Sequence, residues 1–372
     1  MPTGARLAVK DRVVLAVFVI VWLFSLTMRA AGITRPPANW FYVERVGTGG
    51  YPVVQGFLRP DADTVNGVHR GDRVVRVGGT DARGLGQVRF QLTVEDESWR
   101  ARDSLAFTVE RGGGQIVVNE PRIPLNKVRE YNGIIIALVW GIAAILIRLR
   151  ARPSPTTNAV FAGLACYAVF FVSVYNGPYP VAAASLATLA VTSWGVGPLL
   201  VFAYLSFPEE ASALGSRWHR TWPWIFAISG NVYLSTNAAF PLAGDFARTQ
   251  STWPTITWIA ALAYAITRNF RRSGPLGRRQ IKWILYAVYA GTLLALISYA
   301  AVGTMPANPP AWTQMLILLA SLGFPVSMLI AVLRSNLFDI DRLLGATVSY
   351  NLLAFAAVGV ALLLLPVISE TL

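Results

Sequence analysis

Residues 13–28 read VVLAVFVIVWLFSLTM, a run without a single charged side chain. Charged residues close the run on both sides, with Arg12 before it and Arg29 after it. A helix that crosses a bilayer needs about 20 mostly apolar residues, because its side chains then match the hydrocarbon core. With the residues that follow included, the run predicts a membrane-spanning helix over residues 13–33.

Eight more apolar runs of comparable length follow, so the sequence predicts a multi-span α-helical membrane bundle of about nine spans. The composition agrees with this class, since 54% of the 372 residues are hydrophobic and 14% are charged. A soluble domain carries about 25% charged residues. The nine predicted spans cover residues 13–33, 131–149, 157–176, 180–206, 222–240, 252–268, 282–303, 312–333 and 346–367.

The charged residues are concentrated in one segment. About half of them lie within residues 34–129, although this segment is only about a quarter of the chain. It therefore predicts a soluble domain inserted between the first two spans. The chain then divides into a cytoplasmic N-terminus with the first span (1–33), the inserted domain (34–129) and an eight-span bundle without a C-terminal output domain (130–372).

Lys and Arg residues gather on one side of the predicted bundle. With a cytoplasmic N-terminus, the short inside segments carry sixteen of them, whereas the short outside loops carry only Arg248. Cytoplasmic loops of membrane proteins show this excess. We therefore expect a multi-pass protein of the cytoplasmic (inner) membrane, with its N-terminus inside and the inserted domain outside.

The two ends of the chain each allow an alternative. A cleaved signal peptide would use Ala30-Ala31-Gly32 as its cleavage site, but the apolar run is long for one and Arg29 interrupts it, which favours an uncleaved anchor. Nine spans place the C-terminus outside, shortly after the last span. We therefore expect either a fragment or a receptor whose output is a separate protein.

The net charge of +13 comes from short basic runs beside the predicted spans, such as Arg148–Arg152 and Arg278–Lys282. Runs of this kind orient spans and contact anionic headgroups, so membrane lipids, and not nucleic acid, are the expected partners. The single Cys166 excludes a disulfide framework. His69 and His219 are too few for a zinc or haem site, so we expect no metal and no cofactor.

The inserted segment alternates apolar and polar residues in short runs, which predicts a small β-rich domain. Its most informative stretch, residues 67–80, reads GVHRGDRVVRVGGT. Val74, Val75 and Val77 predict a buried strand, and the glycines at 78 and 79 permit a tight turn after it. Asp72 is placed to bind the backbone of the preceding turn. Residues 105–110 and 115–119 predict a hairpin.

The run from Gly67 to Asp72, followed by a strand and a tight turn, resembles the Gly-x-x-x-Gly-Asp pattern of PDZ domains over about 85 residues. The resemblance implies a groove in which backbone N–H groups capture a peptide carboxylate and a strand edge accepts the peptide. The candidate peptide-binding residues are Gly49, Gly50, Gln55, Gly56 and Phe57. The alternative is a domain that only spaces or stiffens a receptor.

Three further stretches at the inside ends of spans, residues 205–209, 278–287 and 333–344, resemble the membrane sensor region of bacterial sensor histidine kinases of the competence-pheromone-receptor type. Those proteins also place a PDZ-like domain between their first two spans. Similar regions are fused to other outputs, such as nucleotide cyclases. The resemblance implies that this chain is the sensor half of a signal-transduction receptor in the bacterial inner membrane.

The most specific element of this resemblance is Phe338-Asp339-Ile340-Asp341-Arg342. Its apolar residues suit packing against helix ends, and its charged residues suit capping and pairing there. We interpret it as a signal connector, with passive capping as the alternative. It is not a catalytic carboxylate pair, since no partner base, metal or phosphate loop stands nearby.

The sequence contains no phosphoacceptor-histidine helix, nucleotide-binding glycine loop or His-Glu-x-x-His motif. Any enzymatic activity would belong to a parent kinase or cyclase. Besides the receptor, two alternatives stay open: a membrane scaffold that recruits an exported protein through the PDZ-like domain, and a small-solute transporter. The transporter is disfavoured because no span carries a charged residue or a histidine near its centre. An extracellular peptide or exported protein is the expected ligand, and a homodimer is a further candidate assembly.

Overall fold

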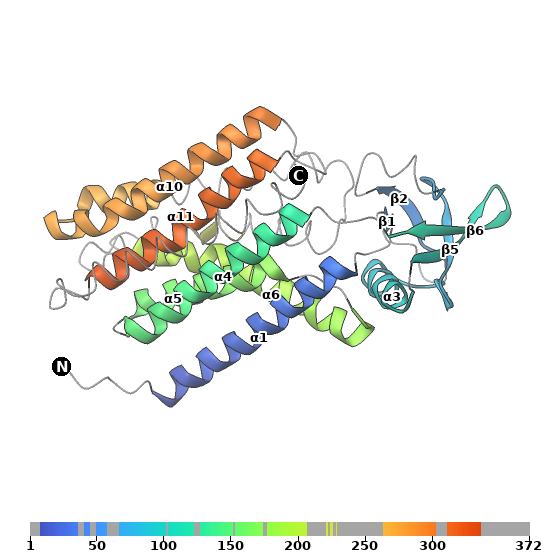
Figure 1. The fold of residues 1–372 in the computed structure, drawn as a ribbon, viewed down its shortest axis with the longest axis horizontal. Coiled ribbons are helices and arrows are strands. Elements are labelled where there is room, and N and C mark those ends of the chain that lie inside the picture. The colour runs from blue at the N-terminus through green and yellow to red at the C-terminus, as the bar shows by residue number, and fades with distance from the viewer. Residues whose placement is uncertain are drawn as a thin grey trace, which may run out of the picture.

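The computed structural model describes a bundle of long helices with a small sheet at one end (Figure 1). Apart from a few single positions between 221 and 228, the described residues are 8–35, 41–44, 50–57, 67–101, 103–122, 127–151, 153–173, 177–206, 263–302 and 311–335.

Six long helices coincide with six of the nine predicted spans. They are α1 (Val9–Thr34), α4 (Lys127–Arg150), α5 (Pro155–Val172), α6 (Tyr179–Ser206), α10 (Pro275–Val302) and α11 (Ala311–Ser335). Residues 263–272 are also helical and overlap the end of the predicted span 252–268. The predicted spans 222–240 and 346–367 lie outside the described residues, apart from isolated positions.

Among the described residues, α1, α4 and α11 are each long and apolar enough to cross a membrane, whereas α5, α6 and α10 hold shorter apolar stretches. Side chains such as Val17, Ile20 and Leu23 on α1 are more than half exposed. A helix with so much exposed apolar surface is stable only against lipid or another apolar partner. The fold is therefore that of a membrane protein.

Two ion pairs join α1 to α4, one at each end of the helices. Arg29 lies 2.6 Å from Glu130 at the end nearer the sheet, and Asp11 pairs with Arg148 at the other end. Eighteen residues separate the two charged positions on each helix, which corresponds to about 27 Å along the axis. This length is close to the roughly 30 Å of a hydrocarbon core.

Between these ion pairs the helices pack closely. A side chain at Gly141 of α4 would overlap the Trp22 ring of α1, so glycine permits the approach. Trp140 stacks between Tyr167 of α5 and Phe324 of α11, with ring centroids 4.2 and 5.1 Å away. These contacts place α4 at the centre of the bundle.

The start of α5 follows directly from its sequence. Ser154 caps the helix by accepting a hydrogen bond from the Thr157 backbone at 3.2 Å, and the Thr157 hydroxyl accepts from the Ser154 backbone at 2.9 Å. Pro155 occupies the first helical position, where its missing N–H has no cost.

The sheet domain consists of antiparallel strands and helix α3 (Gln87–Arg100). The strands pair in the order β1-β2-β3-β5-β6, with β4 on the β3 turn, so β1 and β6 stand at the two edges. Their bounds are β1 Phe41–Glu44, β2 Val53–Phe57, β3 Arg73–Val77, β4 Thr80–Asp81, β5 Ser104–Arg111 and β6 Gly114–Pro121.

The predicted features of the 67–80 stretch are confirmed. Val74 and Val77 are fully buried in β3 and Val75 is 7% exposed, and Gly78 takes a positive φ of 56° in the turn that follows. Asp72 accepts a hydrogen bond from the His69 backbone at 2.8 Å and forms a two-pronged ion pair with Arg111 at 2.7 and 2.8 Å. The predicted hairpin is β5–β6.

Helix α3 was not expected, because its apolar residues fall at every second position, as in a strand. They are Val88, Phe90, Leu92 and Val94. Phe90 and Val94 lie four residues apart on one face and pack in the sheet core. Leu92 points to the opposite face and packs on α6. Three of the four apolar residues are thus buried on two sides of the helix, whereas Val88 is 39% exposed.

Candidate functional site

Helix α3 lies between the sheet and the helix bundle (Figure 1). One face packs on the sheet, where Phe41 of β1 lies 6.2 Å from the Phe90 ring and 5.1 Å from the Phe107 ring of β5. The opposite face contacts the bundle. We call the contact of α3 with α6 the α3–α6 junction, formed by Leu92 and Asp96 of α3 and by Tyr179, Ala182, Leu186 and Leu189 of α6.

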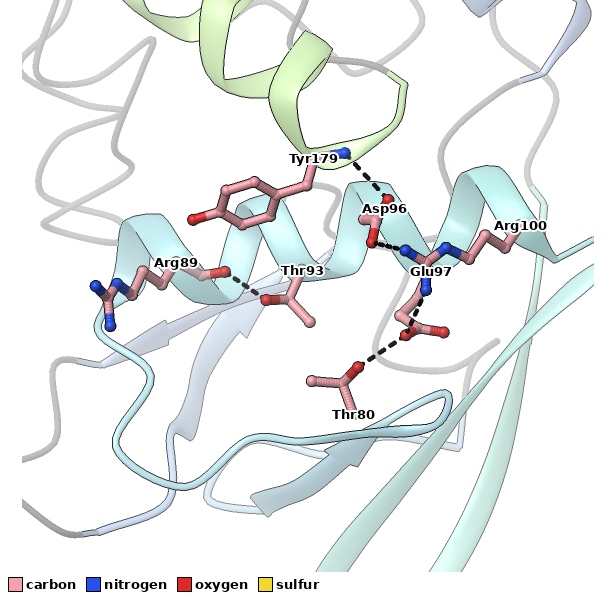
Figure 2. A network of polar contacts seen from close by, with 7 residues as sticks. All are labelled: Thr80, Arg89, Thr93, Asp96, Glu97, Arg100 and Tyr179. Atoms are coloured by element: carbon pink, nitrogen blue, oxygen red, sulfur yellow. Dashed lines mark hydrogen bonds and ion pairs between the residues drawn. The ribbon is translucent and has the colours of Figure 1, made fainter.

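Glu97 holds α3 to the sheet. Its Oε1 accepts a hydrogen bond from the Thr80 hydroxyl at 2.8 Å, and Arg100 lies 3.8 Å away on the next turn (Figure 2). Gly78 lies so close that a Cβ there would overlap the Glu97 carboxylate. The positive φ and this close approach both require glycine at position 78.

Asp96, the neighbouring residue, reaches in the other direction (Figure 2). Its Oδ1 accepts a hydrogen bond from the backbone N–H of Tyr179, the first residue of α6, at 3.0 Å. Its Oδ2 lies 2.6 Å from Arg100. A carboxylate at a helix N-terminus is stabilised by the free N–H groups and the helix dipole.

The hydrogen bonds within the first turn of α6 explain why a residue of another helix caps it. The N–H groups of Val181 and Ala182 both bond to the Pro178 carbonyl, and Pro180 has no N–H. Pro178 has no polar side chain to cap the turn. The Tyr179 N–H therefore has no acceptor within its own turn, and it donates to Asp96 instead.

The apolar part of the junction is small and closed. Leu92 is 5% exposed and packs with Ala182, Leu186 and Leu189 of α6. Phe170 of α5 lies against the same cluster. Burial of a leucine contributes roughly 2 kcal/mol, so this contact is enough to bias the position of the sheet domain on the bundle.

A second contact links α3 to the first membrane helix. The guanidinium of Arg35, which directly follows α1, lies 4.7 Å from the centre of the Trp99 ring. A cation over an indole face contributes roughly 0.5–1 kcal/mol at an exposed site. Helix α3 thus touches the sheet, α6 and the end of α1.

The sheet domain also buries two carboxyl groups. Burial raises the pKa of Glu95 on α3 to about 8, against hydrogen bonding from Gln91 and the charge of Arg122. Burial likewise raises the pKa of Glu120 on β6 to about 8, and neither of its carboxyl oxygens has a hydrogen-bond partner within the described residues. For Asp72, burial raises the pKa, but Arg111 and the His69 backbone outweigh it and lower the net value.

Three of the five predicted peptide-binding residues lie together on one strand. Gln55, Gly56 and Phe57 lie on β2, which pairs with β1, and Gly56 makes room for the Tyr42 ring. The carbonyl of Gly50 accepts a hydrogen bond from the Gly84 backbone at 3.0 Å. Gly49 lies outside the described residues. A peptide-binding role for the five stays a prediction.

The predicted signal connector, Phe338–Arg342, also lies outside the described residues. Conversely, the sequence interpretation missed Asp96 and Leu92. The sequence did contain one indication of Asp96. The segment Gly177-Pro178-Tyr179-Pro180 has no side chain that could cap the helix it begins, so a cap from another segment could be expected.

Comparison with protein-family models, with curated proteins and with solved structures gives no match to this chain. The class of protein therefore rests on the fold itself: a mostly helical membrane protein that carries a small antiparallel sheet domain docked on its helix bundle.

Proposed function

We propose that this chain is the membrane sensor region of a bacterial signal-transduction receptor of the histidine-kinase type. The PDZ-like sheet domain lies outside the inner membrane, receives an extracellular or membrane-borne ligand, and passes the change to a multi-pass bundle with a cytoplasmic N-terminus. Catalytic output belongs to a kinase or cyclase domain.

The observation that carries this proposal is the α3–α6 junction. The same helix packs on the sheet through Phe90, Val94 and Glu97 and on α6 through Leu92 and Asp96. A ligand that moves α3 must therefore change its contacts with the sheet, with α6 or with both. A ligand shifts such an equilibrium only through contacts that differ between two states.

The receptor role is tested in a chimera of the full chain with the catalytic part of a histidine kinase of known activity. Leu92→Ala combined with Asp96→Ala removes the apolar and polar contacts of the junction. We expect basal autophosphorylation to change by roughly fivefold, since a shift of about 1 kcal/mol between two states has this effect.

The matched control is Val88→Ala combined with Glu110→Ala, two more exposed positions of the same domain outside the junction. It should leave autophosphorylation unchanged. Equal output from all three chimeras, at equal membrane insertion, would rule out the receptor role of the junction.

The proposed orientation has its own test. Alkaline phosphatase fused after Gly84 or Pro309 should be active, because these positions are assigned outside. Fusions after Gly215 or Gly274 should be inactive. An active fusion after Gly274 would reverse the orientation.

The connector Phe338–Arg342 is proposed to pass the change to the output domain. In the chimera, Asp339→Ala combined with Asp341→Ala should alter basal output while insertion stays normal. If the basal output of this variant is unchanged, Phe338–Arg342 only caps the helix ends and has no role in signalling.

A scaffold role is the second candidate, and the β6 edge favours it. Strand β6 stands at the sheet edge, and its Ile116 and Val117 are 42% and 64% exposed. An edge strand with exposed apolar side chains suits the addition of a strand from another protein. The two roles are separated by Val117→Lys, which should abolish capture of an exported protein in the scaffold and leave the chimera's basal output unchanged in the receptor.

A further inference from the structure

A pocket of about 270 Å³ lies along the helical segment 263–272. Its lining residues recur at positions i, i+3, i+4, i+7 and i+8, so they form one stripe on that helix. They are Tyr264, Thr267, Arg268, Arg271 and Arg272. Three of the five side chains are therefore guanidinium groups on the same face.

Arg268 is the buried charged residue of this pocket. It is only 9% exposed, and its Nη1 is buried without a hydrogen-bond partner within the described residues. A buried N–H donor of a charged group that lacks a partner is unfavourable. Arg271 and Arg272 at the rim are exposed.

The sequence on both sides of this helical segment supplies no negative charge. Between Asp245 and Asp339 the chain contains no Asp or Glu at all. Arg268 and Arg272 stand at i and i+4, where like charges repel each other. A bound anion would remove this repulsion and give Arg268 its missing partner.

Other groups around the pocket are already engaged. The Thr267 hydroxyl lies 2.7 Å from the Tyr289 hydroxyl of α10, and the Arg278 guanidinium donates to the Ser273 carbonyl at 2.9 Å. These contacts fix helix 263–272 against the start of α10. The backbone that carries the three arginines is thus anchored to α10.

We propose that this pocket binds a phosphate group. The planar fork of arginine fits phosphate oxygens in pairs, and three arginines on one face match a phosphate better than a single carboxylate. The start of α10 lies at the end of the bundle away from the sheet (Figure 1). Under the proposed orientation this end faces the cytoplasm, where anionic headgroups and soluble phosphate compounds both occur.

The test uses the full chain in nanodiscs of phosphatidylcholine alone. Phosphatidylglycerol is added to the lipid in one arm, and inorganic phosphate or pyrophosphate is added to the buffer in the other. Thermal unfolding and native mass spectrometry report binding. We expect at least one arm to raise the Tm, and Arg268→Gln to weaken that binding by roughly tenfold or more.

Two further variants make the outcome decisive. Arg271→Gln changes an exposed lining residue and keeps the proposal testable if Arg268→Gln does not fold. Arg89→Gln is the matched control, because Arg89 is an exposed arginine of α3, outside the pocket and outside the basic runs beside the spans.

Stabilisation by phosphatidylglycerol that the lining variants lose would assign a lipid headgroup, and stabilisation by the soluble anions would assign a free phosphate compound. No stabilisation in either arm, or an equal loss with Arg89→Gln, would overturn the proposal.

Discussion

Asp96 and Tyr179 join the sheet domain to the helix bundle through one hydrogen bond, in which the Tyr179 N–H donates to Asp96 Oδ1 at 3.0 Å. The two residues are 83 positions apart in sequence. Asp96 lies near the end of α3, and Tyr179 is the first residue of α6. Because α6 has no capping side chain of its own, the junction completes the first turn of a bundle helix with a residue of the sheet domain.

The first prediction concerns this bond. Asp96→Ala should accelerate hydrogen exchange of the Tyr179 amide by roughly fivefold, because loss of an N-cap acceptor costs about 1 kcal/mol. Asp96→Asn keeps an acceptor oxygen and should restore most of the protection. Hydrogen exchange of the full chain in nanodiscs measures both, and an equal rate in all three proteins would mean that Asp96 does not cap α6.

The second prediction concerns the core of the sheet domain. Residues 38–126 expressed alone should fold, since strands and α3 close one apolar cluster among themselves. Val75→Asp should unfold this domain, because an unpaired charge buried in β3 costs several kcal/mol. Val117→Asp, at a position 64% exposed, is the control. Circular dichroism measures whether each variant is folded. A folded Val75→Asp domain would contradict the placement of Val75 in the core.

The third prediction is a pH dependence of the same domain. The pKa of Glu120 is raised by burial from 4.5 to about 8. Between these values the unfolded chain loses the proton while the folded domain keeps it. The contribution of Glu120 to stability is therefore largest below about pH 4.5, falls as the pH rises from 4.5 to 8, and reaches its lower level above pH 8. Urea unfolding at several pH values measures the trend.

Glu120→Gln should flatten that pH dependence, and Glu110→Gln at a more exposed position should not. Glu95, whose pKa is also raised to about 8, adds a second contribution that survives in Glu120→Gln. Asp72 has a lowered pKa, so its own effect lies at acidic pH outside this window. An unchanged slope in Glu120→Gln would show that Glu120 is not the titrating group.

The fourth prediction concerns the ion pair of Arg29 and Glu130, whose side chains are 15% and 9% exposed. Arg29→Gln and Glu130→Gln should each lower the Tm of the full chain, because each leaves one poorly solvated charge unpaired. The double variant should lose less than the sum of the two. A double-mutant cycle with an interaction of about 0.5–3 kcal/mol is expected, and strict additivity would argue against the pair.

The sequence predicted the structure correctly where a residue pattern is typical of only one kind of element. The apolar runs placed the six long helices to within seven residues at each end. Val74, Val75 and Val77 identified a buried strand with its turn. The sequence did not single out α3 within the segment predicted as β-rich, because the apolar residues of this helix alternate as in a strand. Asp96 was missed for a related reason: its partner lies in a distant helix, and no local pattern announces a tertiary contact.

The paired charges on α1 and α4 limit how the molecule can move. Since Asp11–Arg148 and Arg29–Glu130 lie at opposite ends of the same two helices, any sliding of one helix along the other separates both pairs together. Piston-like movement between α1 and α4 is therefore opposed twice, whereas α6 meets the sheet domain through a single small junction. Helices α1 and α4 are therefore held in register at both ends, and the proposed ligand-driven shift is assigned to the α3–α6 junction instead.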